Sequence, residues 1–154
     1  MIYIYPFSNE YIDTTHRILL DEDLRKLFLL NRKIGYEDNK KFWESYLLNP
    51  NNNKVFAILE DSEHIGNCGL KNINNNCAEF WIYLEKKYWG LGYGNIVMKK
   101  LIENNFFRND LDEVYAFVDI INKRSISLFE KNGFHKKDKV RINDNTVIKM
   151  TLKR

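Results

Sequence analysis

Cysteines and long hydrophobic runs are scarce in this chain of 154 residues, which also has only two prolines and three histidines. No apolar run approaches the roughly 20 residues that a membrane-spanning helix requires. The N-terminal segment MIYIYPFSNEYID also lacks the basic region and long apolar stretch of a secretory signal. We therefore expect a cytoplasmic protein that has no membrane partner.

The two cysteines, Cys68 and Cys77, flank the segment GLKNINNN, which is typical of a hairpin. A turn centred near residues 73 and 74 would place Cys77 opposite Leu70, so the two thiols would be offset across the hairpin. Offset thiols favour two reduced cysteines over a structural disulfide, and reduced cysteines fit a cytosolic protein.

The charge pattern argues against nucleic acid as a partner. The net charge is only +3, and the 24 basic residues are scattered among 21 acidic ones. This balance is a weak hint of an anionic ligand and falls far below a nucleic-acid-binding footprint. His16, His64 and His135 lie far apart without metal-ligand spacing, so we also expect no metal site.

The length and composition indicate one globular domain that covers residues 1–154. Hydrophobic residues make up 44% of the chain and aromatic residues 14%, which is too many for a disordered protein. A chain of this length can bury a sizeable core by itself. We leave open whether the protein is a monomer or a homodimer.

Periodicity predicts strands in the first half of the chain, with two or three helices after the first strand. The helix best supported is Tyr36–Leu48, where Phe42 and Tyr46 share one face, Trp43 and Leu47 share the adjoining face, and Asn49-Pro50 ends the helix. The strands are predicted at 2–6, 54–61, 64–73 and 77–86, and the last three form an antiparallel meander.

The second half predicts a βαβ unit. Apolar residues spaced four apart, such as Val97 with Leu101 and Ile102 with Phe106, predict a helix over 93–107. A strand at 112–119 follows, then a helix at 122–132 and an antiparallel pair at 134–142 and 146–154. We therefore predict an α+β fold with flanking helices and a mixed, mainly antiparallel central sheet of six or seven strands.

Three glycines stand at alternate positions in YWGLGYGNIVMKK, residues 88–100, between a predicted strand and a predicted helix. Backbone amides at a helix start lack partners within the helix, and the absence of side chains lets a phosphate approach them. The pattern predicts a pyrophosphate-binding loop, with a plain tight turn as the alternative. It contains no GxxxxGK[ST], and GLGYGN lacks the spacing of a dinucleotide-binding GxGxxG.

Two segments together resemble the acetyl-CoA signature of the GNAT superfamily of N-acetyltransferases. They are LEKKYWGLGYGNIVMKKLIE and VYAFVDIINKRSISLFEKNGF. The second carries the whole family pattern N-x-x-S-x-x-x-[YF]-x-x-x-G-F at residues 122–134. In the first, Trp89 replaces the usual Arg or Gln, as in the W-G-x-G-Y variant of the branch that acetylates ribosomal-protein N-termini and small amines.

The resemblance implies a GNAT-like fold and a cofactor site for acetyl-CoA, the acetyl donor. It assigns the coenzyme A pyrophosphate to the backbone amides of Trp89, Gly90, Leu91, Gly92, Tyr93 and Gly94. Main-chain groups of Ile82 and Leu84 would pair with the pantetheine arm as with an added strand. The other side of that arm would be lined by Asn122, Ser125 and Phe129.

Glu79 is the predicted general base, because it is a carboxylate within the apolar strand CAEFWIYL and lies ten residues before Trp89, where such proteins often place the base. Strand alternation puts Glu79, Trp81 and Tyr83 on one face and Phe80, Ile82 and Leu84 on the other. The alternatives are that Glu79 is a solvated residue or the partner of Lys71 across the hairpin.

The general acid departs from the family pattern. Many family members have a tyrosine at the position of Phe129, and phenylalanine has no proton to give. Ser125 and Tyr83 are the remaining candidates for a catalytic donor, with water as a further alternative.

The predicted reaction moves an acetyl group from acetyl-CoA to a primary amine. We favour a small-molecule acceptor such as an amino sugar or a polyamine, with the wall of its site supplied by residues 11–46. The acids of this segment, such as Asp13, Asp21 and Asp23, suit a cationic amine or are solvated helix faces and caps. A protein N-terminus is an alternative acceptor, and a non-catalytic acetyl-CoA sensor or interaction module is an alternative function.

Overall fold

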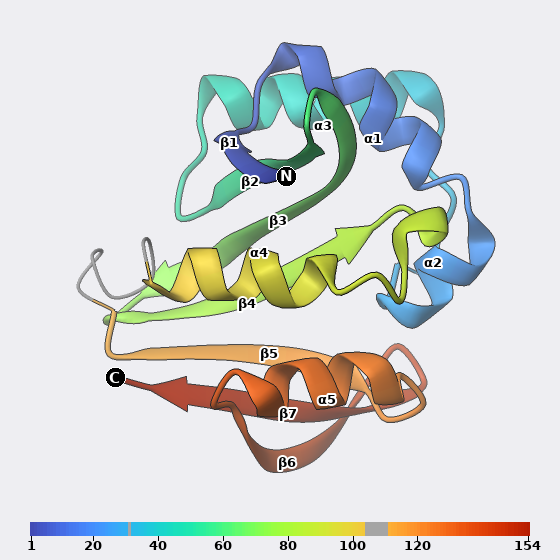
Figure 1. Cartoon of the computed structure of the whole chain (residues 1–154). Coiled ribbons are helices and arrows are strands. Elements are labelled where there is room, and N and C mark those ends of the chain that lie inside the picture. Colours follow the sequence, from blue (N-terminus) through green and yellow to red (C-terminus); the bar gives the residue numbers. More distant parts are fainter. Residues whose placement is uncertain (31, 104–110) are drawn as a thin grey trace.

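The computed structural model describes residues 1–30, 32–103 and 111–154, and its strands form one mixed sheet (Figure 1). The strand order is β1-β2-β3-β4-β5-β7-β6. The strands are β1 (Ile2–Pro6), β2 (Lys54–Glu60), β3 (Glu63–Asn74), β4 (Cys77–Leu84), β5 (Glu113–Asp119), β6 (His135–Ile142) and β7 (Asn145–Lys153). This arrangement confirms the predicted α+β fold class.

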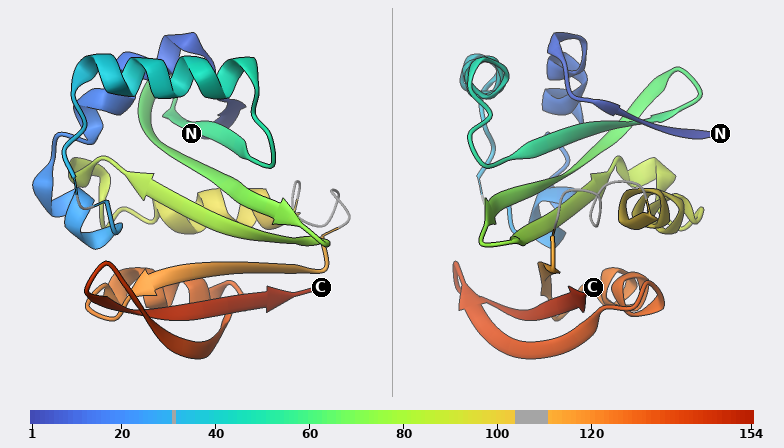
Figure 2. Two further views of the ribbon diagram at one scale, coloured as in Figure 1. Left: turned by 180° about the vertical axis from the view of Figure 1, so that it is seen from behind. Right: turned by 90° about the vertical axis from the view of Figure 1, so that its left-hand side faces the viewer.

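Helices cover both faces of the sheet. Figure 2 shows α4 and α5 on one face, while α1, α2 and α3 cover the other. Their bounds are α1 (Ile12–Ile18), α2 (Glu22–Leu27), α3 (Tyr36–Leu48), α4 (Tyr93–Leu101) and α5 (Lys123–Lys131), with short 3₁₀ turns at Asn9–Tyr11 and Lys86–Tyr88. Of these described helices, none has the length and apolar composition that crossing a membrane demands.

Strands β2, β3 and β4 form the predicted antiparallel meander, and β1 adds to it by pairing antiparallel with β2. One turn of the meander lies elsewhere than predicted. Asn75 and Asn76 have φ of 48° and 61° and make the β3–β4 turn, because asparagine tolerates the left-handed conformation that a two-residue hairpin requires. Cys77 therefore faces Asn74, and the prediction that it faces Leu70 was wrong. The thiols of Cys68 and Cys77 are both free.

Two of the predicted helices begin where expected, at Tyr36 and Tyr93, and α5 begins at Lys123, one residue after the predicted start. The helix from Tyr93 is confirmed as far as Leu101, whereas part of the predicted stretch to 107 lies outside the described residues. In α3 the side chain of Trp43 is buried while that of Phe42 is 63% exposed, so the main apolar face is centred on Trp43. Phe7 stacks on that indole with ring centroids 4.3 Å apart and holds α3 against the sheet.

The parallel pair β4–β5 is short. Only residues 77–79 of β4 pair with residues 113–115 of β5, and the strands then diverge toward their C-terminal ends (Figure 1). β3 holds β4 over almost its full length, and β7 holds β5 in the same way. The rest of the β4 edge is thus left without a strand partner within the sheet.

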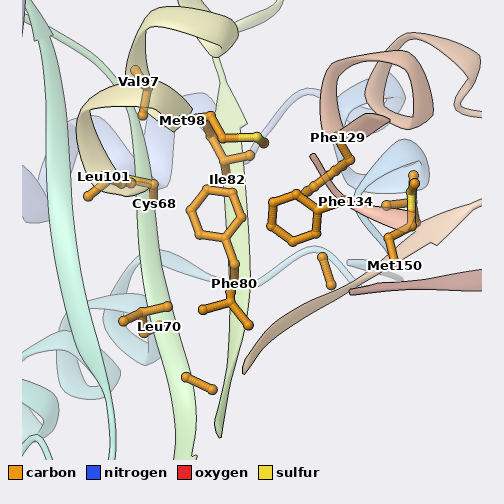
Figure 3. Close-up of a cluster of buried hydrophobic side chains, with 14 of the residues drawn as sticks. Cys68, Leu70, Phe80, Ile82, Val97, Met98, Leu101, Phe129, Phe134 and Met150 are labelled. Carbon is orange, nitrogen blue, oxygen red and sulfur yellow. The ribbon is translucent and has the colours of Figure 1, made fainter. Parts of the chain in front are cut away.

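The side chains of β4 alternate between two apolar clusters, as predicted. Phe80, Ile82 and Leu84 belong to the main core beneath α4 and α5, whereas Trp81 and Tyr83 pack on the opposite face beside α1 and α2. Figure 3 shows the ring of Phe80 beside Phe129 and Met98 at the centre of the main core. The ring centroids of Phe80 and Phe129 are 5.9 Å apart in an edge-to-face arrangement.

The Phe80→Ala substitution should lower the free energy of unfolding by about 3–5 kcal/mol, because it removes a fully buried ring and leaves a cavity between β4 and α5. Phe42→Ala is the matched control, since its ring is largely exposed, and we expect a change within about 0.5 kcal/mol. Urea unfolding followed by circular dichroism measures both changes. Equal losses in the two variants would show that the Phe80 ring is not a core contact.

Candidate active site

The loop between β4 and α4 has the open backbone that its glycines suggest. Gly90 and Gly92 have φ of 78° and 84°, and a Cβ atom built on either would meet nothing within 4 Å. These two glycines therefore serve a left-handed turn that faces open space. Gly94 has a different role, because a Cβ there would lie 3.2 Å from the Leu128 side chain of α5.

Backbone amides at the start of α4 provide donors beside this open space. The amide of Ile96 donates to the Gly92 carbonyl and makes the first turn of the helix. The preceding amides of Tyr93, Gly94 and Asn95 therefore have no acceptor within the helix, and the positive end of the helix dipole lies at the same point. Such a site suits a diphosphate group.

Trp89 departs from its predicted role. Its backbone amide donates to the Lys86 carbonyl at 3.0 Å, so the amides that can serve a phosphate begin at Gly90 and the assignment of the Trp89 amide is corrected. The indole N–H donates to the Leu84 carbonyl at 2.8 Å, and the Arg124 guanidinium lies 5.6 Å from the ring centroid. Trp89 thus joins the loop to β4 and α5.

The unpaired edge of β4 lies where the pantetheine arm is predicted. The amide of Glu85 donates to Ile65 in β3, so strand alternation turns the main-chain groups of Leu84 and Ile82 toward the gap beside β5. The Leu84 carbonyl already accepts the Trp89 indole N–H. The amide and carbonyl of Ile82 are therefore the best placed to pair with an extended ligand.

The start of α5 forms the other wall of the gap. The Asn122 side chain caps the helix by accepting from the Ser125 amide at 3.2 Å, which confirms the predicted cap. Phe129 is only 4% exposed and packs edge-to-face against Phe134 as well as Phe80. The Phe129 ring thus supports the wall, and the Ser125 hydroxyl is the polar group of α5 that lines the cavity.

A cavity of about 620 Å³ connects this gap with the helices on the opposite face of the sheet. Its lining includes Glu79, Ile82, Tyr83, Asn122, Ser125 and Phe129, so most of the predicted side chains lie together. Aromatic residues that were not named as site residues also line it. Phe28, Trp43 and Tyr46 lie in the segment 11–46 that was expected to supply the acceptor wall, whereas Trp81 and Phe117 lie on β4 and β5. They come from segments far apart in the chain, and sequence spacing gives no signal for their meeting.

Glu79 lies at this cavity and also pairs with Lys71. The two residues face each other across β3 and β4, with the Lys71 ammonium 3.4 Å from the Glu79 carboxylate. The Glu79 side chain is 14% exposed. The alternative partner foreseen for Glu79 is therefore present, and the same carboxylate remains at the wall of the cavity.

Tyr83 shares the cavity-facing side of β4 with Glu79. Its hydroxyl accepts a hydrogen bond from the Asn67 side chain at 2.8 Å. Burial raises the pKa of the Tyr83 phenol, so the group stays protonated and can donate a hydrogen bond. The sequence reasoning missed Asn67, although a polar residue within the predicted strand HIGNCGLKNI was a usable signal.

Three acidic residues predicted for the acceptor wall make contacts away from the main cavity. Asp13 accepts from the Tyr36 hydroxyl at a second cavity of about 370 Å³ between α1 and α3. Asp21 caps α2, and Asp23 pairs with Lys86. Over the described ranges, no group of three or more His, Cys, Asp or Glu side chains is placed to hold a metal ion.

Sequence comparison links the chain to acetyltransferases. The family model described as an acetyltransferase (GNAT) domain matches residues 2–135. The acetyltransferase PseH of Campylobacter jejuni is 25% identical over 107 residues, which are 70% of this chain and 66% of that protein. An uncharacterized N-acetyltransferase p20 of Bacillus licheniformis is 33% identical over 90 residues, 56% of this chain and 51% of p20. The match thus covers less than two thirds of each curated relative.

Structure comparison shows the same fold. A spermidine N-acetyltransferase from Vibrio cholerae, solved in complex with CoA and spermine, superposes with a TM-score of 0.90. The superposition covers 99% of this chain and 95% of that one at 17% sequence identity. At this identity the likeness establishes the fold and leaves the acceptor open.

Gly92→Glu should weaken acetyl-CoA binding by about 100-fold or more, because it adds bulk and negative charge in the open space above the helix amides. Gly92→Ala is the matched control, since it brings the same left-handed strain without the charge. Both variants should melt at similar temperatures. Isothermal titration calorimetry with acetyl-CoA measures the affinities, and equal affinity in the two variants would place the pyrophosphate away from this loop.

Proposed function

The chain belongs to the GNAT family of acetyltransferases, and from this premise we propose that it transfers an acetyl group from acetyl-CoA to the primary amine of a small molecule. The proposal rests on one observation, which is that a single cavity contains both a surface suited to the donor and a surface suited to the acceptor. The unpaired edge of β4, next to the glycine loop, suits the donor, and the opposite half of the cavity is walled by α2 and α3. Donor and acceptor can thus meet beside Glu79.

The donor fits the groups that the chain presents. Gly90 and Gly92 leave open space in front of the helix amides for the pyrophosphate, and the main-chain groups of Ile82 face the gap that the pantetheine arm would occupy. Acetyl-CoA supplies the activated acetyl group as a thioester. Asn122 and Ser125 lie on the α5 side of the same gap.

The chemistry requires a neutral amine next to the thioester. The nitrogen lone pair attacks the thioester carbonyl carbon, the carbon–sulfur bond breaks, the sulfur leaves as a thiolate and the nitrogen gives up a proton. Glu79 takes that proton, directly or through a water molecule, with Lys71 beside it to offset its charge. Ser125 or Tyr83 provides a hydrogen-bond donor at the cavity.

The charge of the cavity favours an acceptor that carries one amine. Among the described lining residues, the charged groups are Glu79 and Lys71, which pair with each other. A polyamine would bring further ammonium groups that find no carboxylate there, and desolvated charges without partners are costly. The aromatic rings of Trp43, Tyr46 and Trp81 instead offer flat surfaces to a sugar ring or another compact body.

An acceptor screen tests this proposal. We expect kcat/KM for amino sugars, free or nucleotide-linked, to exceed that for spermidine by about tenfold or more, which corresponds to about 1.4 kcal/mol. The release of free thiol from acetyl-CoA measures the rate. A peptide with a free N-terminus is included, and a preference for spermidine or for the peptide would overturn the proposed acceptor.

Glu79→Gln should lower kcat by about 10²-fold or more, because the amide cannot take the proton of the amine. Glu113→Gln is the control, since Glu113 lies on the adjacent strand and does not line the cavity. Both are measured with the best acceptor of the screen. If acetyl-CoA stabilises the wild-type protein against heat while no amine is acetylated and Glu79→Gln changes nothing, the chain is an acetyl-CoA sensor.

A further inference from the structure

Four buried polar side chains form a connected group behind the acceptor face of β4. They are Thr15 from α1, His64 and Asn67 from β3, and Tyr83 from β4. Asn67, which is 0% exposed, lies at the centre and contacts the other three at 2.8–2.9 Å. Buried polar groups impose hydrogen-bond directions on one another, because each donor must meet an acceptor.

The contacts of His64 determine its tautomer. Its Nε2 atom lies 2.9 Å from the Gly66 carbonyl oxygen, which can only accept, so Nε2 carries a proton. The Nδ1 atom is buried without a hydrogen-bond partner among the described residues and is the bare nitrogen. Burial also lowers the pKa of His64, which keeps the ring neutral. His64 is thus a fixed donor at Nε2.

This donor sets the orientation of Asn67. The Asn67 atom 2.8 Å from the protonated Nε2 must be the amide oxygen. The Asn67 Nδ2 group then faces the other way and donates one hydrogen to Thr15 Oγ1 at 2.9 Å and the other to Tyr83 Oη at 2.8 Å. Both hydroxyl oxygens therefore accept from Asn67.

A hydroxyl that accepts from Asn67 must direct its own proton elsewhere. Within residues 1–30, 32–103 and 111–154, Tyr83 Oη makes no second hydrogen bond, and the side chain lines the cavity together with Glu79 and Ser125. The cavity that the Tyr83 side chain lines is therefore open to a hydrogen bond from its proton.

We infer that His64 and Asn67 are positioning residues that commit the Tyr83 hydroxyl to donate a hydrogen bond into the cavity, onto the thioester during acetyl transfer. The inference rests on the proposed function for the identity of that ligand. As the amine attacks, negative charge develops on the thioester oxygen and then on the departing sulfur. Tyr83 stabilises this charge and keeps its own proton, so the thiolate takes its proton from another source.

This arrangement offers a hydrogen-bond donor in place of the tyrosine hydroxyl that is missing at Phe129. The ring of Phe129 is packed into the core and has no proton to offer. Tyr83 approaches the cavity from β4 instead, on the face that carries Glu79. Because the phenol is desolvated and held by Asn67, its hydrogen bond needs little reorganisation during the reaction.

Three variants test the inference by kinetics: Tyr83→Phe, Asn67→Asp and the double variant. The aspartate accepts from the Tyr83 hydroxyl and turns its proton away from the cavity. We expect each single variant to lower kcat by about 10²-fold, in the range for one lost oxyanion donor, with KM for acetyl-CoA nearly unchanged. The double variant should be no slower than the slower single one. Additive losses, or wild-type kcat in Asn67→Asp, would overturn the inference.

Variants of His64 separate positioning from general stability. His64→Leu removes the donor that fixes Asn67 and should lower kcat, whereas His64→Gln places an amide N–H at a similar reach and should restore most of it. Thr151→Val is the control for the loss of a buried polar group away from the cavity. If His64→Leu and His64→Gln have equal kcat at equal melting temperature, His64 does not position the amide.

A measurement without turnover completes the test. Nitrogen-15 NMR of histidine-labelled protein reports which ring nitrogen of His64 carries the proton, and we expect protonated Nε2 with bare Nδ1. Protonated Nδ1 with bare Nε2 would overturn the inference whatever the activity. A wild-type protein that acetylates no amine would refute the proposed function instead, so the two failures are distinguishable.

Discussion

The site depends on a gap in the sheet, where β4 and β5 separate instead of pairing along their full length. β4 pairs with β5 over residues 77–79 only, and beyond that point each strand is held by its other neighbour. Unpaired main-chain groups in the middle of a domain are costly, so packing must support the opening, and a ligand that paired with these groups would offset that cost. The Phe80 and Phe129 rings support the opening from one side. At the C-terminal end of β4, the Trp89 indole N–H donates a hydrogen bond to the Leu84 carbonyl.

At this opening, backbone groups suit one ligand and side chains suit the other. The groups suited to the donor are main-chain amides of the loop and of Ile82, whose positions follow from the turn and the strand rather than from side-chain identity. The groups suited to the acceptor are side chains from α2, α3 and β4. A donor site of this kind tolerates sequence change, whereas each acceptor-side substitution alters shape or charge.

The same division explains what the sequence could predict. The glycines, the Asn122 cap and the strand alternation are local patterns, and they correctly placed the loop, the βαβ unit and the two faces of β4. The prediction erred where neighbouring residues were equally suitable. Several consecutive asparagines could form the hairpin turn that lies at Asn75, and several consecutive amides could face the phosphate, of which that of Trp89 is already bonded. The orientation of Tyr83 was beyond reach, because it depends on His64 and Asn67 through contacts between elements.

The far edge of the sheet has a consequence for how copies of the chain meet. β6 is exposed along almost its whole length and has the sequence HKKDKVRI, which places several positive charges on a strand with one free side. A bare edge strand is a template for strand addition, the route by which sheets of separate molecules fuse into aggregates. Like charges on two approaching copies of β6 repel each other, so this edge resists extension of the sheet from one molecule to the next.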